Sequence, residues 1–269
     1  GVYSVVFLII CIGVYNIFKR NNIEINTKDE KKVVFTLLIV GFLLRIAAGT
    51  LMDGHNDINL FRNWAQTAAN NLFQFYSNAK SADYPPLYIY VLSIIGKIST
   101  LSYFKDYFIL LLKIPSIAAD IITAYFVYKL GKKHLSCTIS ILLAAFYIFN
   151  PAVFIDSTFW GQVDSIFTLL IVLAIYLLAE KKIAASSAFF AASVLMKPQG
   201  IIFLPILFFE LVRKRSIKAF LKAGITAFIT ALVIILPFAV NESSPLWIFN
   251  LYSKTISEYP YATVNGFNF

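Results

Sequence analysis

Charged side chains are scarce in this sequence, and so are the residues that usually build metal sites and disulfide frameworks. Only 14% of the 269 residues are charged, whereas soluble domains have about 25%. The two cysteines lie in apolar runs, so no disulfide framework is implied, and two histidines are too few for a zinc cluster. The sequence has no phosphate-binding glycine loop, no dinucleotide fingerprint and no serine–histidine–aspartate arrangement. Nucleotide-driven chemistry therefore has no support.

Hydrophobic residues are abundant instead. They make up 59% of the chain, with a mean hydropathy of +0.76, against about 45–50% in soluble domains. This excludes soluble globular and disordered proteins and predicts an all-α polytopic membrane protein. The formal net charge of +9 is not taken as nucleic-acid binding, because basic residues collect in the cytoplasmic loops of membrane proteins.

Apolar runs and basic clusters together predict the topology. Four clusters of Lys and Arg fall on one side of the membrane only if the apolar segment 84–98 does not span it. That segment would be about 22 Å long as a helix, short of a ~30 Å hydrocarbon core, so we place it on the outer face. The expected spanning runs, about eight in all, are 2–18, 33–52, 107–130, 136–151, 163–179, 184–196, 199–212 and 218–240.

Residues 57–72 predict a second helix on the outer surface. Its apolar residues share one face, and Trp64 suits the interface belt. The two faces consist of Ile58, Phe61, Ala65, Ala68 and Leu72 on the apolar side and Asn59, Arg62, Asn63, Gln66 and Asn70 on the polar side.

The chain is expected to have three parts. Residues 1–32 form an extra transmembrane helix with a cytoplasmic loop, 33–240 form the main transmembrane module, and 241–269 form an outer-face segment. The chain starts without a methionine and stops in a loop-like stretch, so we expect it to be part of a longer protein.

Two outer loops carry polar side chains of the kinds that catalyse reactions or bind ligands. Asp57 follows a spanning helix directly and can act as a base or metal ligand, or it can cap the helix 57–72. The loop 150–164 combines polar side chains with aromatic rings, which suits a sugar ring; helix capping at both ends explains the same residues equally well.

Cations within apolar segments are a third feature. Lys197 lies in a Lys-Pro-Gln break between two short helices, where it can receive a phosphate or simply reach the outer interface. Arg45 suits an internal ion pair as well as ligand contact. Lys113 and Asp120 share a helical face and are expected to tune packing or pair with other helices.

These motifs together resemble the GT-C class of integral-membrane glycosyltransferases. The likeness is to glucosyltransferases that use dolichyl-phosphate glucose and to their bacterial polyprenyl-phosphate-sugar relatives, and it covers roughly residues 33–212. Asp164 stands where that family is expected to have Asn, and one extra residue precedes it. The matching positions are Asp57 with Arg62 and Trp64, the run Asp83-Tyr84-Pro85-Pro86-Leu87, the stretch from Ile155 to Gln162, and Lys197 with Gln199, which Pro198 separates.

The resemblance implies inverting transfer of a hexose from a polyprenyl-phosphate donor to a lipid-linked or glycan acceptor. The reaction would take place on the extracytoplasmic face of the plasma membrane and need no cofactor. Since a phosphate leaving group needs no general acid, one carboxylate suffices, and Asp57 is the expected base. Lys197, with Arg45 or Arg62, would bind the donor phosphate. The expected sugar-binding residues are Asp156, Trp160, Gln162, Asp164 and Gln199.

Three alternatives stay open. A transporter of lipid or solute would line its path with Arg45, Lys113 and Asp120, although no internal repeat is visible. A non-catalytic scaffold would keep the fold without activity. A divalent metal held by Asp53 with Asp57 would give a metal-assisted variant of the transfer reaction.

Overall fold

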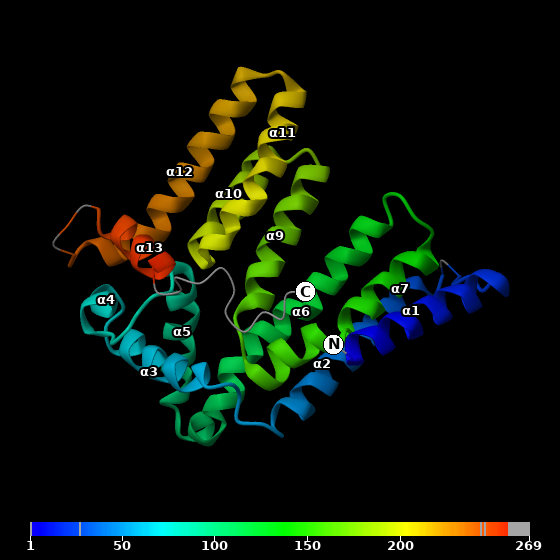
Figure 1. Ribbon diagram of the computed structural model, residues 1–269, viewed down its shortest axis with the longest axis horizontal. Helices are drawn as coiled ribbons and strands as arrows, with labels where there is room; N and C mark the ends of the chain where they lie inside the picture. Colours follow the sequence, from blue (N-terminus) through cyan, green and yellow to red (C-terminus); the bar gives the residue numbers. More distant parts are fainter. Residues whose placement is uncertain (1, 27, 243, 245, 258–269) are drawn as a thin grey trace. The chain divides into compact units, whose positions relative to one another are not determined.

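The computed structural model describes residues 2–26, 28–242, 244 and 246–257. Within these residues every regular element is a helix (Figure 1), so the prediction of an all-α protein is confirmed for this part of the chain. The chain divides into two compact units, each built from two stretches of sequence. Unit 1 consists of Gly1–Leu60 and Tyr103–Lys182, and unit 2 consists of Phe61–Ser102 and Ile183–Phe269.

Fewer helices are long enough to span a membrane than the sequence predicts. Within the described residues, four qualify by length and composition, and a fifth span arises if a pair of helices bent by 46° counts as one. The chain is a polytopic membrane protein, but the predicted count of about eight spans is not confirmed. The candidates are Val2–Arg20, Glu30–Gly49, Ser102–Gly131 and Ile217–Ala239, with the bent pair Cys137–Ile148 and Pro151–Trp160.

The count differs because several apolar runs are broken into short helices. The predicted spans 163–179, 184–196 and 199–212 correspond to the helices Asp164–Ala179, Ile183–Met196 and Leu204–Lys214, each with fewer than 18 residues, and a straight helix needs about 20 to cross the hydrocarbon core. Periodicity and hydropathy reveal an apolar run, but they do not reveal where the helix within it stops.

Unit 1 is organised around one long helix, α6. It packs against α2, α7 and α9, and a buried apolar cluster that includes Val34, Ala124 and Ile148 joins α2, α6 and α7. The helix α1 has no buried residue, as expected of a helix that faces lipid. The elements are α1 (Val2–Arg20), α2 (Glu30–Gly49), α6 (Phe108–Gly131), α7 (Cys137–Ile148), α8 (Pro151–Phe154), the π-helix η3 (Ile155–Trp160) and α9 (Asp164–Ala179).

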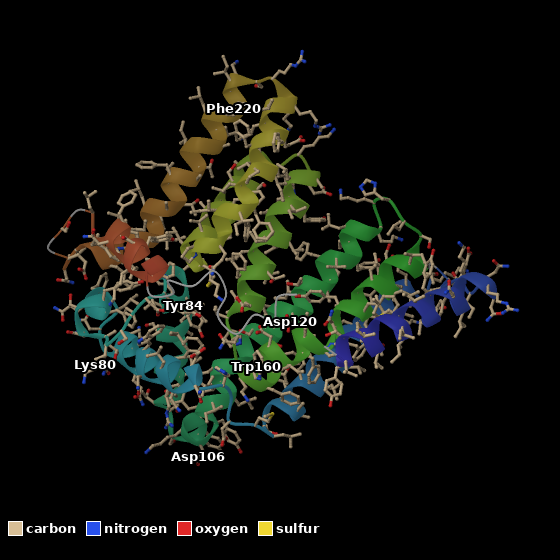
Figure 2. All side chains as sticks on the ribbon, in the orientation of Figure 1. Lys80, Tyr84, Asp106, Asp120, Trp160 and Phe220 are labelled. Atoms are coloured by element: carbon tan, nitrogen blue, oxygen red, sulfur yellow. The ribbon has the colours of Figure 1, made fainter. Side chains whose placement is uncertain are left out.

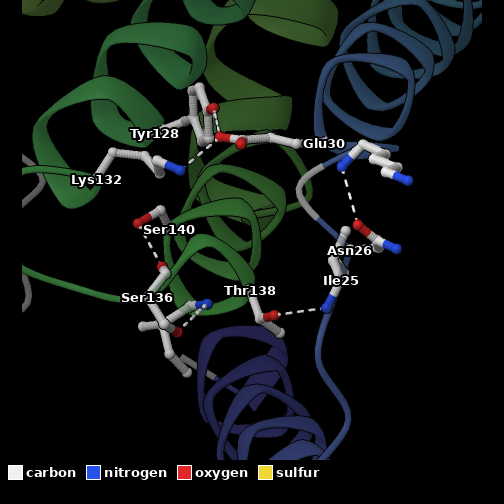
Figure 3. Close-up of polar contacts among 10 residues, drawn as sticks. Ile25, Asn26, Glu30, Tyr128, Lys132, Ser136, Thr138 and Ser140 are labelled. Atoms are coloured by element: carbon white, nitrogen blue, oxygen red, sulfur yellow. Dashed lines mark hydrogen bonds and ion pairs between the residues drawn. The ribbon is translucent and has the colours of Figure 1, made fainter.

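Polar contacts close one end of this helix group (Figure 3). The carboxylate of Glu30, in the first turn of α2, accepts hydrogen bonds from the Tyr128 hydroxyl and from Lys132, whose Nζ lies 2.8 Å away. The Thr138 hydroxyl accepts from the backbone N–H of Ile25 at 2.9 Å. These contacts join the start of α2 to the end of α6, and the start of α7 to the loop before α2.

Unit 2 is built from shorter helices. The helix α10 packs against α12 and α5, and α12 also contacts α5 and η1. Two elements, α3 (Asp57–Asn70) and the 3-10 helix η2 (Ser102–Tyr107), lie where the chain passes between the units. The remaining elements are η1 (Leu72–Gln74), α4 (Phe75–Asn78), α5 (Pro86–Ser99), α10 (Ile183–Met196), η4 (Pro198–Phe203), α11 (Leu204–Lys214), α12 (Ile217–Ala239) and α13 (Trp247–Ser257).

The predicted amphipathic helix is present as α3, which ends at Asn70, and its faces are as expected except that Leu72 lies beyond it in η1 and is half-buried. Ile58, Phe61, Ala65 and Ala68 are buried, and the predicted polar face is exposed. The placement of Trp64 in the interface belt is wrong. Its ring is 1% exposed, and its indole N–H donates to the carbonyl of Lys80 at 3.1 Å. A ring at this position can reach a buried acceptor, which helical periodicity does not reveal.

The predicted division into 1–32, 33–240 and 241–269 stays a prediction. Residues 258–269 of its last part lie outside the described residues.

Candidate functional site

Four residues of unit 1 form a polar group that we call the Asp57 cluster: His55, Asp57, Trp160 and Gln162. The Gln162 side-chain amide donates to Asp57 Oδ2 at 2.7 Å, and His55 Nδ1 lies 3.6 Å from the same oxygen. The ring centroids of His55 and Trp160 are 5.6 Å apart. About half of each of the His55, Asp57 and Trp160 side chains is exposed, so the cluster is open to a ligand.

The backbone of two loops holds this cluster together. The His55 N–H donates to the Trp160 carbonyl at 3.1 Å, and the Gln162 carbonyl accepts from the Ser116 hydroxyl at 2.6 Å. Gly161 ends the π-helix η3 in the left-handed region, with φ +72°, and a Cβ there would lie 2.8 Å from Ile58 Cδ1. Glycine suits this turn because it accepts positive φ and leaves the space that the Ile58 side chain occupies.

Lys113, in the same unit, binds carbonyl groups at the end of α2. Its side chain is fully buried, and its ammonium donates to the carbonyls of Gly49 and Met52, at and just beyond the end of α2. The carbonyls at a helix C-terminus lack intrahelical partners and attract a cation. The prediction that Lys113 pairs with another helix is therefore confirmed.

Arg45 has an internal partner in unit 1. It is fully buried, its Nε lies 3.5 Å from Asp120 Oδ2, and its guanidinium lies 4.8 Å from the centre of the Phe154 ring. The Tyr147 hydroxyl donates to the other Asp120 oxygen at 3.3 Å. This bears out the predicted pairing of Asp120 and the ion-pair alternative for Arg45. Within the described part of the chain, the guanidinium nitrogens of Arg45 are buried without a hydrogen-bond partner, and the phosphate contact expected of Arg45 stays a prediction.

Asp53 does not join the Asp57 cluster through any contact that would suggest a metal. It lines a separate cavity of about 250 Å³ in unit 1, together with Thr50 and Asp106. Among the described residues, no group of three or more His, Cys, Asp or Glu side chains could hold a metal ion.

Unit 2 contains a second polar site, which we call the Lys197 cavity. It has a volume of about 360 Å³. The Lys197 ammonium lies 5.9 Å from the centre of the Tyr84 ring, and the Thr255 hydroxyl donates to the Asp83 carbonyl at 2.6 Å. Tyr84 is labelled in Figure 2. The lining residues are Asp83, Tyr84, Pro85, Lys197, Pro198, Gln199 and Thr255.

The predicted break at Lys197 is what opens this cavity. The helix α10 ends at Met196, Lys197 is extended with φ −146° and ψ 140°, and Pro198 begins the 3-10 helix η4. The residue before a proline is biased toward extended backbone. A Cβ on Gly200 would lie 2.6 Å from the backbone nitrogen of Val194, so glycine allows η4 to fold back against α10.

The predicted site residues are thus distributed between the two units. Asp57, Trp160 and Gln162 lie together in unit 1, and Lys197 and Gln199 lie together in unit 2. Asp164 lies in the first turn of α9, where a carboxylate is favoured by the helix dipole, and Asp156 lies within η3. Arg62 is exposed on α3.

Three residues of these sites were not predicted. His55 stands two positions before Asp57, and that short spacing could have signalled a pair. Tyr84 was quoted only as part of a helix-opening motif, although the proline that follows it disfavours helical backbone at this position. Nothing in the sequence around Thr255 indicates that α13 returns to Asp83.

Comparison with known families decides which class of protein carries these sites. The family model described as GPI transamidase subunit PIG-U matches residues 56–258, which is most of the chain. The chain belongs to the PIG-U family. A search of curated proteins found no match. The matched range begins within the Asp57 cluster and extends past the last residue of the Lys197 cavity.

Membership in the PIG-U family corrects the resemblance drawn from the sequence. The identification as a GT-C glycosyltransferase is wrong, and with it the hexosyltransferase activity and the polyprenyl-phosphate sugar donor. The motifs behind that identification were a carboxylate after a helix, a Pro-Pro-Leu helix start and a Lys-Pro-Gln break. All three lie at the start of a helix or at a break between helices, and none of them requires sugar transfer.

Proposed function

We propose that this chain is a non-catalytic membrane subunit of a GPI transamidase complex. The observation that carries the proposal is the match of residues 56–258 to a family of GPI transamidase subunits. The scaffold alternative weighed from the sequence agrees with this role. The partners would then be the other subunits of the complex and its substrates, in place of a sugar donor.

The side chains of the described residues suit a structural subunit better than a subunit that catalyses transamidation. Transfer of an acyl group needs a nucleophile activated by an adjacent base. Both cysteines lie in apolar helices, Cys11 within α1 and Cys137 at the start of α7. His55 contacts Trp160 and Asp57. We therefore assign bond making and breaking to another subunit.

The two polar sites take a binding role in this proposal. A GPI anchor is a glycolipid with a phosphate in its head group. The Lys197 cavity offers an ammonium, the Gln199 side chain and the Tyr84 ring, which suit a phosphate beside apolar groups. The Asp57 cluster offers a carboxylate and an exposed indole, which suit sugar hydroxyls and a sugar face. Asp156 and Asp164 lie on either side of Gln162 in sequence and belong to the same proposed surface.

Complementation tests the subunit role. The tagged full chain is expressed in cells whose own PIG-U subunit has been deleted, and surface display of a GPI-anchored reporter is measured. We expect the reporter to return and the other transamidase subunits to co-purify with the tagged chain. A chain that reaches the membrane but restores neither would contradict the subunit role.

Replacing Lys197 by methionine tests the binding role separately. The variant keeps the length of the side chain and removes the charge, so we expect normal co-purification with reporter display reduced by about tenfold or more, the scale of one lost charged hydrogen bond. Lys80→Met is the matched control, because Lys80 is exposed in unit 2 and does not line the cavity. Equal display by the two variants would remove Lys197 from the proposed site while leaving the subunit role intact.

A further inference from the structure

The turn between α11 and α12 concentrates positive charge. We call its five cations the basic tip: Arg213, Lys214, Arg215, Lys218 and Lys222. Arg213 pairs with Glu210 through two contacts of 2.8 and 2.9 Å. In the described part of the chain, the other four have no carboxylate within 4.0 Å.

Two basic residues just beyond the end of α6 have acidic partners. Lys132 pairs with Glu30 at 2.8 Å, and Lys133 pairs with Glu180. The Lys133 ammonium holds the pKa of the Glu180 carboxyl below its ordinary value, so this partner stays ionised near neutral pH. Among the described residues, four cations of the basic tip therefore have no acidic partner within 4.0 Å, whereas Lys132 and Lys133 each have one.

The basic tip lies where a spanning helix begins. Ile217 starts α12, which is long and apolar enough to cross a membrane, and its side chain is 79% exposed. Phe209, on the preceding helix, is 67% exposed. Exposed apolar side chains at this point suit the hydrocarbon core, and cations beside them would then lie at the level of the lipid head groups.

Arg215 occupies a backbone conformation that favours glycine. It ends α11 in the left-handed region, with φ 48° and ψ 35°. Glycine adopts this conformation at lower cost than a residue with a Cβ. The backbone of Arg215 therefore does not stabilise the turn better than glycine would. What arginine provides at this position is its guanidinium group.

We propose that the basic tip binds the phosphate groups of anionic phospholipids at the membrane surface. Clustered Lys and Arg beside a spanning helix attract anionic lipids, and guanidinium groups pair with phosphate through two parallel hydrogen bonds. The interaction fixes the depth of the α11–α12 hairpin in the membrane, and it favours anionic over zwitterionic lipids.

Photocrosslinking in vesicles tests this proposal. The full chain is placed in phosphatidylcholine vesicles that contain either a photoactivatable phosphatidylserine or the matching phosphatidylcholine probe, and the crosslinked residues are mapped by mass spectrometry. We expect phosphatidylserine to be preferred at residues 204–222. Arg215→Gly should lower that preference roughly fivefold, and the variant K214Q/R215G/K218Q/K222Q should abolish it, because each cation near an anionic surface contributes on that scale.

Lys181→Gly is the matched control. Lys181 also has a positive φ, 59°, and is exposed, so the substitution relaxes the backbone and removes one charge in the same way. It should leave the preference at residues 204–222 unchanged. An undiminished preference in the fourfold variant, or an equal loss in Lys181→Gly, would overturn the proposal. Since Arg215→Gly relaxes the turn, its result stands even if the fourfold variant folds poorly.

Discussion

Replacing Gly96 by alanine should disrupt the packing of α3 on α5 in unit 2. A Cβ at this position would lie 2.1 Å from the backbone oxygen of Ala65 and 2.8 Å from the Ala69 side chain. The Ser93 hydroxyl donates to the Ala68 carbonyl at 3.1 Å on the same contact. Because the obstacle is backbone, the helices must separate, and we expect a loss of about 3 kcal/mol or more. Thermal unfolding of the purified protein in detergent measures the change.

Gly224→Ala provides the comparison. Gly224 lies within α12, and a Cβ there meets nothing within 4 Å. Alanine is favoured over glycine inside a helix by about 1 kcal/mol, so this variant should be as stable as the parent or more so. A Gly96→Ala protein that unfolds at the same temperature as Gly224→Ala would show that α3 and α5 do not pack as closely as described.

Removing the carboxylate of Asp120 should destabilise unit 1 by a similar amount. Asp120→Ala leaves the fully buried Arg45 guanidinium without its ion-pair partner and the Tyr147 hydroxyl without its acceptor. Breaking one side of a buried pair typically costs about 3–5 kcal/mol, because the remaining charge stays away from water. The expected result is a lower unfolding temperature and poor recovery of folded protein.

The double variant Arg45→Met with Asp120→Leu separates charge from packing. With both charges gone, no uncompensated ion is left, and apolar residues of similar size often replace a buried pair at little cost. We expect the double variant to be more stable than Asp120→Ala. If the double variant were equally unstable, the loss of stability in Asp120→Ala would come from the cavity at position 120, and the ion pair itself would contribute little.

Several features of the fold could be predicted from local sequence. The buried face of α3 follows from the spacing of Ile58, Phe61, Ala65 and Ala68, and the break at Lys197 follows from the proline after it. These predictions depend on helical periodicity and on the steric effect of proline, both of which act over a few residues.

Features that depend on distant segments could not be predicted. The stretch 150–164 was taken for a loop, but much of it is helical: Ile155–Trp160 is a π-helix that ends at Gly161. The burial of Trp64 depends on the carbonyl of Lys80, and the Lys197 cavity depends on Thr255. No property of a short window indicates which segment will come to lie beside it.

The wrong family identification has the same origin. Asp57 was predicted as a lone catalytic base, yet the structure places it within a group that includes His55 and Gln162. Short motifs that follow one another along a chain describe only how individual helices begin, end and are capped. The match over residues 56–258 uses the pattern of most of the chain, and it selects a family of GPI transamidase subunits.

The sequence alone determined the physical class of this protein, since a chain with 59% hydrophobic and 14% charged residues cannot keep its apolar surface out of water except in a membrane. It also determined where many helices begin and which face of α3 is buried. Tertiary structure alone decided which charges meet, as in the Arg45–Asp120 pair, and which have no carboxylate within 4.0 Å among the described residues, as for Lys214 and Arg215. The reason is that a buried charge is stabilised only by a specific partner across space, and that partner is chosen by how the helices pack.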